Sequence, residues 1–134
     1  EALDTLSVEE KSWIAPLPFP YDKNMPAYVK MMEMFKDSNH ANENFPKSQA
    51  LKDYTMAYFI LKNFKEKYKF IHLNGSYHSN NFEGIYWYLK HEKPNLKIKT
   101  ISTVLQKDIE KLSDENKNLS NYIIVTDLDI TRTH

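Results

Sequence analysis

Apolar residues recur at helical spacing in two parts of this chain and form a short continuous run between them, and this change of pattern predicts its fold. From residue 47 to about 67 they recur at helical spacing, which predicts the longest helix of the chain. A short apolar run at 70–73 then predicts a buried strand, and it breaks at Asn74-Gly75-Ser76. Helical spacing returns from Phe82 to Leu89. We therefore expect a strand, a tight turn and a helix within residues 68–89.

Two shorter helices are expected before this stretch. Ser7 and Glu10 form a capping-box pattern, which predicts a short helix ending before Pro16. Pro26 is well placed in the first turn of a second helix, which reaches about residue 36. Between the two helices, prolines alternate with apolar residues over 16–20. This pattern predicts an extended segment, which is either a connector packed on the domain or a recognition ligand for a partner.

The C-terminal part adds two strands and a helix. Residues 96–102 alternate between apolar and polar, as in a half-exposed strand, and residues 122–126 form an apolar run typical of an interior strand. An amphipathic helix from Leu105 to Leu119 is expected between them. The order from residue 68 is therefore β-α-β-α-β, preceded by three helices. This order predicts an α/β fold with a small parallel sheet.

Length and composition narrow the picture. A chain of 134 residues suits a single domain, helical over 1–67 and α/β over 68–134. Eighteen basic and eighteen acidic side chains cancel, so no overall field attracts the molecule to nucleic acid or to an anionic membrane. The chain lacks cysteine, which excludes disulfides, thiolate metal sites and cysteine nucleophiles. No apolar run approaches the roughly 20 residues that span a bilayer.

The turn after the apolar run is the best candidate for a functional site. Ligands collect where a strand of an open α/β sheet gives way to a helix, because free backbone N–H groups and loop side chains converge there. This turn carries Asn74, Gly75, Tyr77 and His78. Imidazole is the commonest metal ligand in proteins and also binds haem iron, and a tyrosinate can bind haem iron as well. His78 is therefore the first candidate residue and Tyr77 the second.

Two residues elsewhere are candidates to support His78. Asp53 lies on the apolar face of the long helix beside Met56, where a buried carboxylate needs a partner or its pKa rises. Either Asp53 lies at the edge of this face in contact with solvent, or it reaches the turn at 74–81. His40 lies in a polar loop and matters only if the fold brings it to His78. A zinc site made of these three residues lacks a supporting motif such as HExxH.

Three stretches of the chain resemble one known family. They are 13–18 (WIAPLP) with the following 28–31 (YVKM), then 49–57 (QALKDYTMA), and then 74–78 (NGSYH). The middle stretch is similar to the family's alanine-glutamine, aspartate and methionine-alanine helix, and the last is similar to its glycine–x–histidine strand end. In this order and spacing they resemble the ChaN-like haem-binding uptake lipoproteins, which belong to a superfamily with the Tiki and erythromycin-esterase-like proteins.

The resemblance implies a bacterial cell-envelope protein, periplasmic or anchored to the outer membrane through an N-terminal lipidated cysteine, that takes part in haem or iron uptake. It also implies that this chain is the C-terminal portion of a longer ChaN-like fold, because the family's glycine–glutamate–x–histidine motif is absent. The cofactor-binding residues expected from the turn and the long helix are His78, Tyr77, Asn74, Gly75, Asp53 and Met56.

Three functional hypotheses follow. The first is a haem- or iron-binding protein without enzymatic activity, with His78 and its turn as one wall of the site. The second is a metal-dependent hydrolase of the wider superfamily, in which His78 and Asp53 help to hold a divalent metal ion and His40 is a further ligand. The third is an interaction domain that binds a partner through 16–20 and the methionine-rich second helix. No nucleic-acid partner is expected, and a homodimer is left open.

Overall fold

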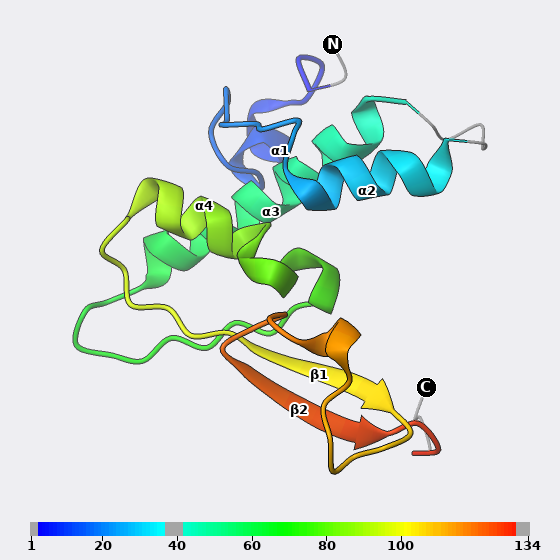
Figure 1. Ribbon diagram of the computed structural model, residues 1–134. Coiled ribbons are helices and arrows are strands. Elements are labelled where there is room, and N and C mark those ends of the chain that lie inside the picture. Colours follow the sequence, from blue (N-terminus) through cyan, green and yellow to red (C-terminus); the bar gives the residue numbers. More distant parts are fainter. Residues whose placement is uncertain (1–2, 37–41, 131–134) are drawn as a thin grey trace.

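The computed structural model describes residues 3–36 and 42–130 of the chain, and it contains four helices and two strands in these ranges. The strands pair in parallel, with Ile101 opposite Tyr122. The predicted α/β class with a small parallel sheet is therefore confirmed (Figure 1). The elements are α1 (Val8–Ser12), α2 (Pro26–Phe35), α3 (Asn44–Asn63), α4 (Ile85–Glu92), β1 (Ile101–Gln106) and β2 (Tyr122–Asp127), with 3-10 turns η1 (Ser76–His78), η2 (Asn80–Phe82) and η3 (Asp114–Asn116).

The helices begin where the sequence provides starting signals. Ser7 and Glu10 form the predicted capping box of α1, since the Ser7 hydroxyl accepts from the Glu10 N–H and the Glu10 carboxylate accepts from the Ser7 N–H. Pro26 occupies the first position of α2 as predicted. Helix α3 begins three residues before the predicted start and ends at Asn63, because Phe64 adopts an extended backbone conformation. None of the described helices is long and apolar enough to cross a bilayer.

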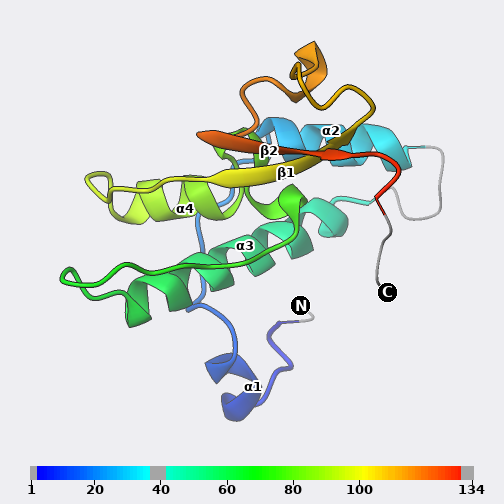
Figure 2. The same cartoon turned by 90° about the horizontal axis from the view of Figure 1, so that it is seen from below.

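The core lies among the helices. Helix α3 packs on α4 through a cluster that includes Ala57, Ile60 and Ile85, and a second cluster joins Met25 and Tyr28 of the α2 region to Ala50 of α3. Phe19 and Trp87 pack against both clusters. The proline-rich segment is therefore packed on the domain through Phe19, as expected of a connector. Both views place α3 between α1 and the strands (Figure 1, Figure 2).

The apolar run at 70–73 does not form the predicted strand. It lies outside the sheet without regular secondary structure, and Ile71 and Leu73 are 82% and 89% exposed. His72, which the prediction placed inside this strand, is also exposed. A strand requires backbone partners on a neighbouring strand, and among the described residues only β1 and β2 pair in a sheet. The run at 70–73 is apolar, but neither β1 nor β2 pairs with it and buries its side chains.

The predicted helix from Leu105 to Leu119 is also wrong. Strand β1 runs through Gln106, and the connection to β2 is a loop that contains only the short turn η3. The buried Gln106 amide donates to the carbonyl oxygens of Asp108 and Lys111, while its oxygen accepts from the Ser113 N–H and the Asn116 side chain. These bonds satisfy backbone groups that a helix would otherwise pair internally, so they favour the loop.

The two faces of the small sheet are covered unequally. Side chains alternate between the faces, and the register places Ile101, Leu105, Tyr122 and Ile124 on one of them. All four are between 37% and 64% exposed, whereas Ser102 and Gln106 on the opposite face are buried. Parallel strands are normally covered on both faces. The opposite face also carries Val104, Ile123 and Val125, which are half-buried, so in the described part of the chain the face with Ile101 and Ile124 is the one left open.

Candidate functional site

His78 and Asp53 form the centre of the candidate site. His78 ends the turn η1, and its Nδ1 lies 2.5 Å from Oδ1 of Asp53 on α3. The Asp53 side chain is 1% exposed, and the His78 side chain is 24% exposed. Asp53 therefore reaches the turn, which was the second of the two interpretations of its place on the apolar face. The His78 imidazole is thus held by a buried carboxylate on one side, and part of the ring is accessible to solvent.

Tyr28 of α2 completes the hydrogen bonding of the buried carboxylate. Its hydroxyl donates to Oδ2 of Asp53 over 3.2 Å, so each carboxylate oxygen has a partner. Burial raises the pKa of Asp53 from 3.8 to about 6, although the hydrogen bonds from His78 and Tyr28 act in the opposite direction. The Asp53 carboxyl group is therefore far less acidic than an exposed aspartate, and its two partners stabilise the ionised form that His78 requires.

Gln49 lies against the edge of the His78 ring. Its side-chain nitrogen is 2.8 Å from His78 Nδ1 and 3.5 Å from His78 Nε2. A neutral imidazole carries its proton on one nitrogen, and the carboxylate of Asp53 is the stronger acceptor for a proton on Nδ1. That tautomer leaves Nε2 unprotonated, with the Gln49 amide nitrogen at 3.5 Å as its neighbour in the protein. The site thus presents one ring nitrogen that can bind a ligand or accept a proton.

The backbone between His78 and α4 depends on a glycine. Gly84 has φ +52°, and a Cβ atom there would lie 2.4 Å from the His78 carbonyl oxygen and 3.1 Å from Asp53 Oδ2. Asn81 and Phe82 also have positive φ, at 58° and 62°. Such conformations cost energy in non-glycine residues and persist where the surrounding structure imposes them. This turn brings His78 against Asp53 and leaves room for no side chain at position 84.

Glu83 links the same turn to α2. Its carboxylate accepts from the Ala27 N–H over 2.9 Å, so it satisfies a free donor at the start of α2. Burial raises the pKa of Glu83, and the bond from Ala27 opposes this shift. Because Tyr28 follows Ala27 directly, the turn that carries His78 also fixes the helix end from which Tyr28 reaches Asp53.

The other predicted site residues lie around this centre at different positions. Asn74 donates to the Gly75 carbonyl oxygen and to the Ser79 hydroxyl, so it stabilises the turn itself. Tyr77 is 47% exposed, and its hydroxyl faces the sulfur of Met34 on α2. His40 lies outside the described residues, so its role as a metal ligand stays a prediction.

A shallow hollow opens beside His78. Its volume is about 400 Å³, within the range of small-molecule and cofactor sites. Thr55 accepts from the Ala15 N–H over 3.2 Å, which holds the segment after α1 against α3 and so forms one wall. The lining is mostly apolar, with one imidazole and one ammonium group: Ile14, Leu51, Lys52, Thr55, Met56 and His78.

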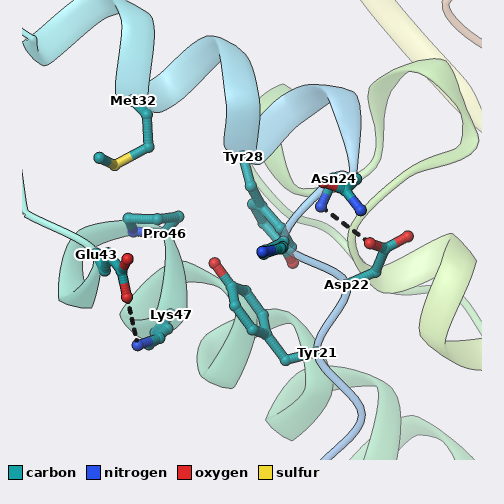
Figure 3. A pocket seen from close by; sticks show the side chains of 9 residues that line it. Tyr21, Asp22, Asn24, Tyr28, Met32, Glu43, Pro46 and Lys47 are labelled. Carbon is teal, nitrogen blue, oxygen red and sulfur yellow. Dashed lines mark hydrogen bonds and ion pairs between the residues drawn. The ribbon is translucent and has the colours of Figure 1, made fainter.

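A second hollow, of about 680 Å³, lies on the other side of Tyr28, between the segment before α2 and the start of α3. Figure 3 shows the Tyr21 hydroxyl pointing into it, across from Met32 and Pro46. The Tyr21 ring stacks on Tyr28 with 5.7 Å between the ring centres. Lys47 at the rim is paired with Glu43 over 3.2 Å. The positive and negative groups of the rim balance, so this hollow shows no preference for an anion or a cation.

No group of three or more histidine, aspartate or glutamate side chains is arranged to hold a metal ion within residues 3–36 and 42–130. His78 and Asp53 form a pair whose two facing atoms bond to each other. The arrangement is that of an imidazole oriented by a carboxylate behind it, which is the usual support of a histidine that binds iron or zinc through its other nitrogen.

Sequence reasoning did not assign a role to Tyr28, Gln49 or Gly84. Tyr28 and Gln49 belong to the stretches that carry the family resemblance, but no role follows from those stretches for either residue. Gly84 is one of two glycines in the chain, which is a usable signal, since a glycine in a chain with so few of them often marks a backbone constraint. The contacts of Tyr28 and Gln49 depend on the packing of α2 on α3 and are not visible in the spacing.

Comparison with known protein families identifies the family of this chain. A family model described as haem-binding uptake, Tiki superfamily, ChaN matches residues 1–89, which include α1, α2, α3, the His78 turn and the first half of α4. No curated protein and no solved structure matches the chain. The family match covers more than half of the 134 residues and contains the whole His78–Asp53–Tyr28 arrangement. The protein therefore belongs to the ChaN family of haem-binding uptake proteins in the Tiki superfamily.

Proposed function

We propose that this protein binds haem in the hollow beside His78, with His78 Nε2 as the nitrogen that binds the iron. The family is described by haem-binding uptake, so haem is the ligand that family membership indicates. The observation that supports this site is the 2.5 Å contact between His78 Nδ1 and the buried Asp53. It orients the ring so that Nε2 is the unprotonated nitrogen, in the manner of supported haem and zinc ligands.

The other residues of the hollow fit the rest of the cofactor. Haem is a flat apolar ring with two carboxylates on one edge, and the walls made by Ile14, Leu51 and Met56 are apolar. Lys52 is exposed at the rim of the hollow and is a suitable partner for a carboxylate. Bound haem would supply an iron centre that accepts an imidazole ligand. The protein supplies the oriented ring, an apolar wall and a cation.

We also propose that haem binding serves haem or iron uptake at the bacterial cell envelope. The family description and the sequence resemblance support this role. The test is fractionation of the source bacterium with an antibody against this chain, followed by growth on haem as the iron source with the gene deleted. Recovery in the cytosolic fraction, together with normal growth on haem, would contradict it.

Titration of haemin into the purified chain tests the binding site. The Soret band is expected to shift and to saturate at one haem per chain. His78→Ala is expected to weaken binding by at least about tenfold, because it removes the proposed iron ligand. His91→Ala is the matched control, since His91 stacks on Trp87 of α4 and is not a lining residue of the hollow. Circular dichroism of both variants verifies folding.

Three outcomes separate the possibilities. Weakening by His78→Ala but not by His91→Ala supports the site. Equal saturable binding by all three proteins would place haem elsewhere on the chain. Unsaturable binding by all three would reject haem binding by this chain, and it would leave the role of the His78–Asp53 pair to another ligand.

A further inference from the structure

Tyr28 carries a buried phenol directly behind the proposed haem ligand. The residue is 1% exposed, and its hydroxyl lies 3.2 Å from Asp53 Oδ2. Burial raises the pKa of the Tyr28 phenol well above its ordinary value, so the group keeps its proton at any physiological pH. Its O–H is therefore a permanent donor to Asp53.

This donor limits how the Asp53 carboxylate can be oriented. With Oδ2 bonded to Tyr28, Oδ1 faces His78 Nδ1. We propose that Tyr28 is a positioning residue for His78: through Asp53 it holds the imidazole in the tautomer that protonates Nδ1 and leaves Nε2 free for a ligand. The inference rests on the proposed function only in naming haem iron as that ligand.

The backbone closes the same arrangement from the other side. Glu83, five residues after His78, bonds the Ala27 N–H, and Tyr28 is the next residue of α2. His78 and Tyr28 are thus connected in two ways. Their side chains are connected by hydrogen bonds through Asp53, and their backbones are connected by the bond between Glu83 and Ala27. Displacement of Tyr28 from Asp53 would require movement of the helix end that Glu83 anchors.

Loss of the Tyr28 hydroxyl has a definite chemical consequence. Without the bond from Tyr28, Oδ2 loses the partner that fixes the orientation of the carboxylate, so Oδ1 is no longer held against His78 Nδ1. The Gln49 side-chain nitrogen lies 2.8 Å from the same Nδ1 and can donate to it only when Nδ1 carries no proton. A weaker hold by Asp53 therefore favours the bond from Gln49, and the imidazole proton moves to Nε2. That tautomer has no free lone pair on Nε2 and binds iron poorly.

The first test uses the protein without haem. Nitrogen-15 NMR of the imidazole groups reports the tautomer of His78 in wild type, in Tyr28→Phe and in Tyr21→Phe. Tyr21→Phe is the matched control, because Tyr21 stacks on Tyr28 from the second hollow and its removed hydroxyl points away into that hollow. We expect the Nδ1–H form in wild type and in Tyr21→Phe, and a mixture containing Nε2–H in Tyr28→Phe.

The second test is haemin affinity of the same three proteins. Tyr28→Phe is expected to weaken binding about tenfold, in the range known for residues that support a metal-binding histidine from outside, and Tyr21→Phe is expected to leave it unchanged. An unchanged His78 tautomer in Tyr28→Phe overturns the inference even if haemin still binds. A shifted tautomer without haemin binding by any protein upholds the positioning role and rejects the proposed haem function.

If Tyr28→Phe fails to fold, NMR of the wild-type protein alone tests the inference. A buried hydroxyl held by Asp53 exchanges slowly with water and gives an observable proton resonance with a nuclear Overhauser contact to the His78 Nδ1–H region. Detection of this proton together with the Nδ1–H tautomer supports the inference. A rapidly exchanging Tyr28 hydroxyl, or a His78 ring protonated on Nε2, overturns it.

Discussion

The helical and strand regions of this protein distribute their apolar side chains in opposite ways. In the helical region, Ala57, Ile85 and Tyr88 are almost fully buried between α3 and α4. In the strand region, the face of β1 and β2 that carries Ile101 and Ile124 is open, while the opposite face buries the polar side chains of Ser102 and Gln106. The difference shows that the helical region makes its own core, and this core holds Asp53 and His78 in place. The strand region contributes little to that core.

A small number of polar contacts join the two regions at η2. The Ser102 hydroxyl of β1 donates to the Asn80 side chain over 2.8 Å, and the Asn81 N–H donates to the Leu119 carbonyl oxygen over 2.8 Å. Both contacts lie within three residues of His78. The site is therefore built on the helical region and is bordered by the strand region only through the 78–84 turn.

Gly84→Ala is expected to have the largest effect on the helical region. The added Cβ would lie 2.4 Å from the His78 carbonyl oxygen, and the positive φ is unfavourable for alanine. We expect a loss of stability of about 4 kcal/mol or more, together with displacement of His78 from Asp53. Gly75→Ala is the control, since its Cβ would meet only His78 Cδ2 at 3.9 Å and its φ is −64°. Urea unfolding of both variants tests the prediction, and equal losses would contradict it.

A matched pair of isoleucine substitutions compares the two regions directly. Ile85→Ala removes a side chain that is 4% exposed and should cost about 2–5 kcal/mol through a cavity in the core. Ile101→Ala, at a position 64% exposed on β1, should cost less than about 1 kcal/mol. Chemical denaturation measures both. A large cost at Ile101 would show that the open face of the sheet is covered in solution, for example by a second copy of the chain.

The raised pKa of Asp53 predicts a pH dependence of stability that Asp53→Asn removes. The folded protein binds this proton more tightly than the unfolded chain, whose aspartate has the ordinary pKa of 3.8. The contribution of Asp53 to stability is therefore full below about pH 4 and is lost as the pH rises through 6, by about 3 kcal/mol. Unfolding free energies of both proteins at pH 4 and pH 7.5 measure this difference. An identical pH dependence in the variant would refute the assignment.

Ser102→Ala tests the connection between the regions and has the smallest expected effect. It removes the donor to Asn80 at a position 6% exposed, which should cost about 1 kcal/mol. Because Asp53 and Tyr28 are on the helices, the His78 tautomer should stay unchanged. A shifted His78 resonance in this variant would show that the strand region also positions the site.

Local signals predicted the helices well and the C-terminal topology only in part. The capping box at Ser7, the proline at position 26 and the long periodic stretch of α3 act within a few residues, so they are readable from sequence. The run at 70–73 looked like a strand because it is apolar, yet strand formation depends on a distant partner. The helix expected after Leu105 does not form, because the side chain of Gln106 bonds to the loop that follows it. The spacing of apolar residues gives no indication of these hydrogen bonds.

The sequence predicted the central pair of the candidate site, His78 and Asp53, but not Tyr28, which bonds to Asp53. His78 was found because an imidazole follows a glycine turn, and Asp53 because a carboxylate on an apolar helical face needs a partner. The hydroxyl of Tyr77 faces Met34 and not the His78–Asp53 pair. The predicted role of Tyr77 in binding haem therefore stays a prediction. Tyr28 lies 25 residues from Asp53 and 50 from His78 in sequence, so only the packing of α2 on α3 reveals its contact.

The open apolar face of the sheet also shapes the heat capacity of this chain. A 134-residue protein typically unfolds with a heat-capacity increment of about 1.6–2.0 kcal/mol/K, which arises mainly from newly hydrated apolar surface. Ile101, Tyr122 and Ile124 on this face are each more than half exposed in the folded chain and add little to that increment. The stability curve of this chain is consequently flatter with temperature than its length suggests. Any polypeptide that covers the face would bind with a negative heat-capacity change.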